Sequence, residues 1–162
     1  MRSAILITCC VFSAFAHADE PLGPPTFQRF SSPNGAVVAY ATPGSDTRVV
    51  NSASGEVLWR IPRWTRLLYL SNDGAHAAEV YGGLNLIPLD ATPDFVLVTL
   101  WTRGEKTGEV ALRAIAASAS ALQRTVSHYD WGAVKGFGDN NELIVERFDG
   151  KVFHFATDGT PR

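Results

Sequence analysis

One short phrase recurs three times along this chain, each time between two runs of residues that favour β-strands. It consists of a glycine, a charged residue and a valine, at Gly55–Val57, Gly108–Val110 and Gly150–Val152. Glycine tolerates the positive φ angles that tight hairpin turns require. Short β-branched runs separated by such turns bury their apolar side chains most simply by pairing with their neighbours. The sequence therefore predicts antiparallel hairpins.

A second pattern predicts how the hairpins repeat. The stretches "SSPNGAVVAYA" and "LSNDGAHAAEV" each place a serine, a polar pair and a glycine before small and β-branched residues. The matching serines, Ser32 and Ser71, lie about 40 residues apart, a spacing typical of a meander or a propeller-like array. The stretch "SASGEVLW" resembles the closing strand of quinoprotein-type propeller repeats, which implies a blade-like sheet. The predicted fold is all-β, either a propeller-like meander of antiparallel hairpins or a bent sandwich.

One alanine-rich segment departs from the β pattern. Ile115, Ala119 and Leu122 fall at near-helical spacing, and the segment 114–124 contains neither glycine nor proline. It predicts one short helix of two to three turns that covers an exposed end of the sheet.

The last hairpin carries apolar side chains on both of its faces. In "KVFHFA", Val152 and His154 share one face, and Phe153 and Phe155 share the other. A strand that packs on one side only usually alternates apolar and polar residues. This pattern predicts a hairpin that is packed on two sides.

The N-terminus has the three-part layout of a secretory signal peptide. Arg2 precedes an uncharged apolar run from Ala4 to Phe15, and Ala16-His17-Ala18 places small residues where a signal peptidase cuts. The apolar run is much shorter than the roughly 20 residues that span a bilayer. We expect a signal peptide over 1–18, a flexible proline-rich lead over 19–26 and a single β-rich domain over 27–162.

Export changes the chemistry of the mature chain. Cys9 and Cys10 belong to the removed segment, so a cysteine-free domain in the periplasm or outside the cell depends on its hydrophobic core alone. Without Arg2, 13 basic residues face 16 acidic ones, since the full chain has 14 Lys and Arg and 16 Asp and Glu. This weak acidic balance argues against nucleic acid as a partner, and no later apolar run is long enough to cross a membrane.

The stretch "LWRIPRWTRLL" contains the first candidate site. Trp59 alternates with apolar neighbours and is expected to face the core, whereas Trp64 lies in the connection after Pro62. Arg63 and Arg66 flank Trp64, and tryptophan and arginine are both enriched at protein interfaces. Trp64 therefore either covers the core or forms a binding surface with these two arginines.

The stretch "HYDW" contains the second candidate. Tyr129, Asp130 and Trp131 can form a binding loop, next to glycines that allow it to move. In the alternative, both aromatic rings pack inward and the polar side chains face water. A third interpretation pairs His128 with Asp130 as a proton relay, although the sequence identifies no nucleophile for it.

The sequence contains no pattern typical of a zinc or calcium site. His76, His128 and His154 have no ligand-like spacing for zinc, and the stretch "DNNE" lacks the ligand pattern of a calcium loop. We expect no cofactor and no metal. The leading hypothesis is an exported, non-catalytic protein-interaction module, with a glycan- or small-molecule-binding module and a small hydrolase using His128 and Asp130 as the alternatives.

The signal peptide yields the first testable prediction. The chain recovered from the periplasm or the medium should begin at Asp19, because cleavage follows Ala18. N-terminal sequencing and intact mass measurement check this directly, and a recovered chain that still starts at Met1 would contradict it.

Overall fold

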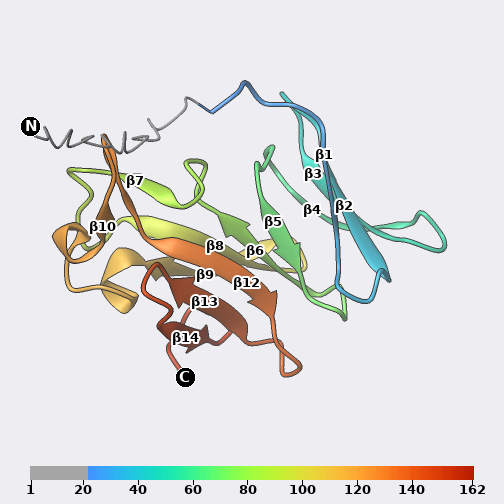
Figure 1. Cartoon of the computed structure of the whole chain (residues 1–162). Coiled ribbons are helices and arrows are strands. Elements are labelled where there is room, and N and C mark those ends of the chain that lie inside the picture. Colours follow the sequence, from blue (N-terminus) through green and yellow to red (C-terminus); the bar gives the residue numbers. More distant parts are fainter. Residues whose placement is uncertain (1–21) are drawn as a thin grey trace, which may run out of the picture.

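The computed structural model describes residues 22–162 and shows an almost entirely β architecture (Figure 1). Fourteen strands form antiparallel sheets, and within the described residues there is no α-helix. The predicted all-β fold of antiparallel hairpins is thereby confirmed. The signal peptide over 1–18, its cleavage site and the start of the lead lie outside the described residues.

Three larger sheets follow one another along the chain. The first sheet contains β1 (Gln28–Ser31), β2 (Val37–Ala41), β3 (Thr47–Asn51) and β4 (Val57–Ile61) in that spatial order. The middle sheet has the order β5 (Leu68–Leu70), β6 (His76–Val80), β8 (Val96–Thr102) and β9 (Glu105–Ala111). The third sheet has the order β12 (Gly132–Phe137), β13 (Leu143–Arg147) and β14 (Val152–Phe155).

The middle sheet lies between the other two and is covered on both faces (Figure 1). Leu68 and Leu70 of β5 join the core shared with the first sheet, which includes Val49 and Trp59. Tyr69, which alternates with them, packs against the core shared with the third sheet. The period of two along a strand thus sends consecutive side chains into two different cores.

The three sheets approach one another most closely at their first strands. Strand β5 contacts β1 on one side and β12 on the other. The sheets therefore converge along the line of β1, β5 and β12, and each sheet extends away from that line through its later strands.

Two segments that connect strands of the larger sheets pair with each other and form a small fourth sheet. Its spatial order is β10 (Gln123–Arg124), β11 (His128–Asp130) and β7 (Leu86–Pro88). Because β7 comes from the connection between β6 and β8, this small sheet ties two distant parts of the chain together.

The continuous helix expected near 114–124 is replaced by two single 3-10 turns, Leu112–Ala114 and Ala119–Ala121. Ser118 between them is extended, with φ −159° and ψ 164°. Burial of Ile115 and Leu122 in the core, together with pairing of β10 with β11, outweighs the helix propensity of the alanines.

The sequence predicts that Trp59 and the apolar residues that alternate with it face the core, and this is correct in part. Trp59 and Ile61 are buried as expected, but Val57 is 40% exposed. The register shifts between Val49, which pairs with Trp59, and Val50, which pairs with Val57. This bulge rotates Val57 to the opposite face of the first sheet.

The three repeated glycines have two different roles. Gly55 and Gly150 lie in turns with φ of 72° and 82°, where glycine avoids the cost of a Cβ. Gly108 instead lies inside β9, and the predicted turn there is wrong. A Cβ on Gly108 would lie 2.0 Å from the Asp158 carbonyl oxygen, so this glycine permits close approach of two backbones.

Gly108→Ala should therefore destabilise the fold by about 1–3 kcal/mol, because backbone atoms must move to admit the methyl group. Gly82→Ala is the matched control, since nothing lies within 4 Å of its Cβ position. Urea unfolding of both variants measures the difference. Equal stabilities would show that the contact with Asp158 is unimportant.

Candidate functional site

Trp64 and Arg66 lie together in the connection between β4 and β5. The Arg66 guanidinium lies 5.2 Å from the centre of the Trp64 ring. The Trp64 indole donates to the Thr26 carbonyl at 2.9 Å, and Arg66 donates to the Gly23 carbonyl at 2.8 Å. This pair therefore holds the described part of the proline-rich lead against the body of the protein.

The Arg63 side chain binds Glu79 on β6 of the middle sheet. Its Nε and Nη2 atoms donate to the two carboxylate oxygens of Glu79 at 3.0 and 2.7 Å. Its guanidinium also lies over the ring of Trp101, whose indole donates to the same Glu79 carboxylate. The hydrogen bonds to Glu79 raise the pKa of Arg63 against the opposing effect of burial. Arg63 thus lies over β6 and β8, the two inner strands of the middle sheet, and does not join Trp64 and Arg66.

The "HYDW" segment forms β11 and the residue that follows it. Tyr129 is half-buried and packs against the core between the middle and third sheets. Asp130 accepts a hydrogen bond from the Gly132 N–H at 2.9 Å, and the His128 ring contacts the Ser127 hydroxyl at 2.9 Å. These short-range contacts fix the turn from β11 into β12.

Trp131 is fully buried, which agrees with the alternative in which the aromatic rings of this segment pack inward. Its indole donates to the Leu84 carbonyl at 2.7 Å, and its backbone N–H donates to the Asn85 carbonyl at 3.0 Å. Leu84 has a φ of 60°, a left-handed conformation that is costly for a branched side chain. Trp131 therefore holds a strained turn in place instead of contacting a ligand with its ring.

That turn forms one wall of a cleft of about 420 Å³, which is the strongest candidate site. Its other walls come from β5, from the start of β12 and from the end of β13. Apolar side chains such as Leu67 and Val134 line it, and Phe148, 37% exposed, lies at its edge. The volume falls within the range of about 300–1,000 Å³ that is usual for ligand sites.

The charged groups of the cleft leave it with an excess of negative charge. Asp130 and Arg147 are charged residues of its lining, whereas the Glu146 side chain alternates with buried Val145 and so faces away from the middle sheet. Arg147 is already paired with Asp149 through two hydrogen bonds of 2.9 and 2.6 Å. The hydrogen bond from Arg147 is the main reason that the pKa of Asp149 falls to about 2, and Asp149 in turn raises the pKa of Arg147.

Of the six residues proposed from sequence as binding residues, Asp130 and Trp131 line this cleft. Sequence reasoning missed Tyr69 and Glu146, which also line it. Both lie on strands in which more buried and less buried residues alternate. Nothing in the sequence distinguishes them from other strand residues. Their convergence depends on how the middle sheet packs beside the third, which no local pattern signals.

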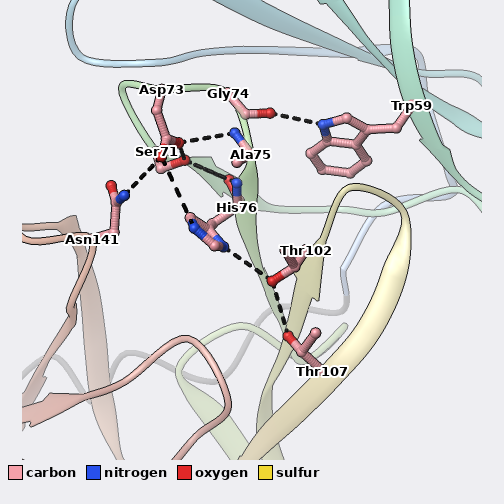
Figure 2. Close-up of polar contacts among 9 residues, drawn as sticks. All are labelled: Trp59, Ser71, Asp73, Gly74, Ala75, His76, Thr102, Thr107 and Asn141. Carbon is pink, nitrogen blue, oxygen red and sulfur yellow. Dashed lines mark hydrogen bonds and ion pairs between the residues drawn. The ribbon is translucent and has the colours of Figure 1, made fainter.

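A separate polar network joins the hairpin turns of the three sheets, and Figure 2 shows the part of it around Asp73 and Asn141. The backbone N–H of Asn34, in the turn between β1 and β2, donates to the Asn72 side chain at 3.0 Å. Asn141, in the turn between β12 and β13, donates to Asp73 at 2.7 Å. The three turns thus form a row, with the turn between β5 and β6 in the middle.

Within this row, Ser71, Asp73 and His76 lie close together but are not arranged as a catalytic triad (Figure 2). The Ser71 hydroxyl donates to Asp73 at 2.5 Å and accepts from the backbone N–H of His76 at 2.9 Å. The His76 ring contacts the Thr102 hydroxyl at 3.0 Å through Nδ1. Because the serine hydroxyl is bound to Asp73 and not to the imidazole, these residues stabilise a turn. Residues 22–162 contain no cluster of three or more side chains suited to a metal ion.

The comparisons with known proteins identify no family. No family model and no curated protein matches the chain. A solved structure described as the eukaryotic initiation factor is similar, with 21% sequence identity and a TM-score of 0.42. The similarity covers 81% of this chain and 31% of that one. In the part that the structure describes, no helix is long and apolar enough to cross a membrane.

The turn row yields a pH-dependent prediction. Burial raises the pKa of Asp73, but hydrogen bonds from Ser71, Ala75 and Asn141 and the nearby His76 together lower it below its ordinary value. A lowered folded-state pKa stabilises the fold above the unfolded value of about 3.9, and this stabilisation is lost as pH falls through the folded value.

Asp73→Asn should therefore unfold at lower urea concentration than the native protein at pH 7, and the gap should narrow steadily below about pH 4. Asp90→Asn, at an exposed position, is the control. A gap for Asp73→Asn that stays constant from pH 7 to about pH 2 would show that the charge of Asp73 has no stabilising role.

Proposed function

We propose that this chain is an exported, non-catalytic protein-interaction module that takes a positively charged side chain of a partner protein into the cleft between β5 and β12. The observation that carries the proposal is the combination of apolar walls with the carboxylate of Asp130, which accepts a hydrogen bond from the N–H of Gly132 in the lining. A lysine or arginine side chain has the matching form, an apolar stem that ends in a cation.

The surroundings of the cleft favour a protein over a free ion. Phe148 offers an exposed aromatic ring at the cleft edge, and aromatic residues are enriched at the centres of protein interfaces. Arg147 is held by Asp149 and by the Ile115 carbonyl, so its charge is neutralised and its geometry is fixed. A rigid wall beside the Asp130 carboxylate lowers the entropic cost of binding.

The composition of the cleft supports binding without catalysis. Among its described lining residues there is no serine, cysteine, histidine or lysine, the usual nucleophiles and bases. His128, which the hydrolase hypothesis pairs with Asp130, is not among the residues that line the cleft.

The location of the protein belongs to the same proposal. A signal peptide over 1–18 delivers the chain to the periplasm or the exterior, where its partner would be another exported protein. The cysteine-free described chain suits an oxidising compartment, because it offers no thiol to mispair.

A glycan or another small molecule is the second candidate, and the size of the cleft favours it. Tyr69 contributes an aromatic ring to the lining, and such rings stack on sugar faces. Trp131 lies beside the cleft, so its fluorescence should respond to an occupant. A change on titration with a panel of envelope sugars, without any change on addition of a lysine-rich peptide, would favour this candidate.

A photo-crosslinking experiment tests the protein-binding proposal. A photoreactive phenylalanine analogue in place of Phe148 should give one discrete protein adduct in cells that export the chain. The same analogue at Val126, which is 63% exposed and not a lining residue, is the matched control and should give none.

The role of the charge is tested in the Phe148-labelled protein. Asp130→Lys should reduce the adduct by at least about tenfold, because it replaces an attractive charge with a repulsive one. A circular-dichroism spectrum of the variant confirms that it is folded. An adduct that persists at full yield in the folded variant would contradict the proposed role of the cleft.

A further inference from the structure

The first and third sheets, at the two ends of the stack, each have one face against which no other sheet of residues 22–162 packs, called here the uncovered face. The first sheet packs on the middle sheet through Val49 and Trp59, and the third packs on it through Val145 and Phe155. Their other faces point away from the middle sheet, and both carry apolar side chains among the charged ones.

The uncovered face of the first sheet has two valines at its centre, Val38 and Val50, which are 3% and 8% exposed, and basic side chains around them. We call this the basic end face, and it is formed by Arg29, Val38, Tyr40, Arg48, Val50 and Val57. A hollow of about 320 Å³ lies over it. Phe27, 59% exposed, extends the apolar area by stacking on Tyr40 with ring centres 5.9 Å apart.

The charge of this face is positive. Arg60 pairs with Arg48 across β3 and β4, so three arginines lie on the face. Asp46 contacts Arg48 at 3.6 Å and also binds Arg60. One carboxylate among three guanidinium groups leaves a positive excess that nothing else on the sheet neutralises in the described chain.

The uncovered face of the third sheet has the opposite character. We call it the acidic end face, and it is formed by Ala133, Glu142, Ile144, Glu146, Val152 and His154. Val152 is 46% exposed, although the sequence predicts that this hairpin packs on two sides. Lys135 lies 3.5 Å from Glu146, and His154 lies 3.3 Å from Glu142, which leaves one carboxylate in excess when the histidine is neutral.

We propose that the two faces cover each other between two copies of this chain: the basic end face of one copy packs on the acidic end face of the next. Both faces have an apolar centre and opposite charges, which is the complementarity that such a contact requires. Because a contact of this type joins two different surfaces, each copy keeps one free face unless the assembly closes.

The shape of the stack favours closure as a dimer. The three sheets converge along β1, β5 and β12 and extend outward from that line, so the two end faces lie at an angle to each other. Two such copies facing each other bury all four end faces and leave no sheet face open. This contact shares Ala133 and Glu146 with the lining of the cleft proposed above, and it does not depend on the cleft binding a partner.

Sedimentation equilibrium of the mature chain at about 100 μM tests the proposal, a concentration that would populate a contact with a micromolar Kd. The expected species is a dimer. Arg29→Glu with Arg48→Glu should weaken association by at least about tenfold, and so should Glu142→Lys with Glu146→Lys, since each places like charges opposite one another.

The decisive step is to mix the two reversed variants. In the mixture, the glutamates of one variant face the lysines of the other, and the unaltered faces meet as well, so the dimer should return. Arg124→Glu and Glu105→Lys, both exposed and on other elements, are the matched charge controls and should leave the dimer intact.

A mature chain that is monomeric at this concentration overturns the proposal. A dimer that survives both reversals, or one that mixing fails to restore, also overturns it, because association would then use other surfaces. Circular-dichroism spectra of all variants establish that loss of the dimer is not loss of the fold.

Discussion

The rest of this structure depends on the burial of the middle sheet on both faces. Its strands place Leu68 and Leu70 in one core and Leu67 and Tyr69 in the other, so side chains on both sides of β5 leave water. Burying an apolar side chain of this size contributes about 1.5–3 kcal/mol, and a described chain without cysteines has no disulfide to replace that contribution. The middle sheet therefore fixes the positions of the two outer sheets, and the convergence of β1, β5 and β12 follows from it.

The same packing explains why the cleft lies where it does. Strand β5 is the first strand of the middle sheet, and β12 is the first strand of the third, so their side-by-side placement leaves a space where the third sheet begins. Trp131 fills the core beneath that space and holds the turn at Leu84 through its indole N–H. A buried tryptophan next to a strained turn is a positioning device, because the free energy of core burial stabilises a conformation that the turn alone would not keep.

Sequence patterns predicted those features of the fold that depend on neighbours in the chain. The antiparallel hairpins, the burial of Trp59 and the glycine turns at Gly55 and Gly150 all follow from local periodicity and from φ. The bulge that turns Val57 outward, the extended Ser118 and the role of Gly108 depend on partners far away in sequence. The candidate site also depends on both local and long-range features. Asp130 could be predicted because it lies between two aromatic residues, whereas Glu146 lines the cleft only because of how the sheets pack.

One residue connects the cleft with the proposed contact between copies. Glu146 lines the cleft, and it also lies on the acidic end face, where Lys135 approaches it at 3.5 Å. Its main chain borders the cleft at Gly132, where a Cβ would lie 2.1 Å from the Glu146 carbonyl oxygen, and its side chain faces the neighbouring copy in the proposed contact. A cleft occupant that displaces the main chain of Glu146 would therefore also displace the carboxylate that faces the arginines of that copy. Two events that act on one residue are thermodynamically coupled, and the coupling acts equally in both directions.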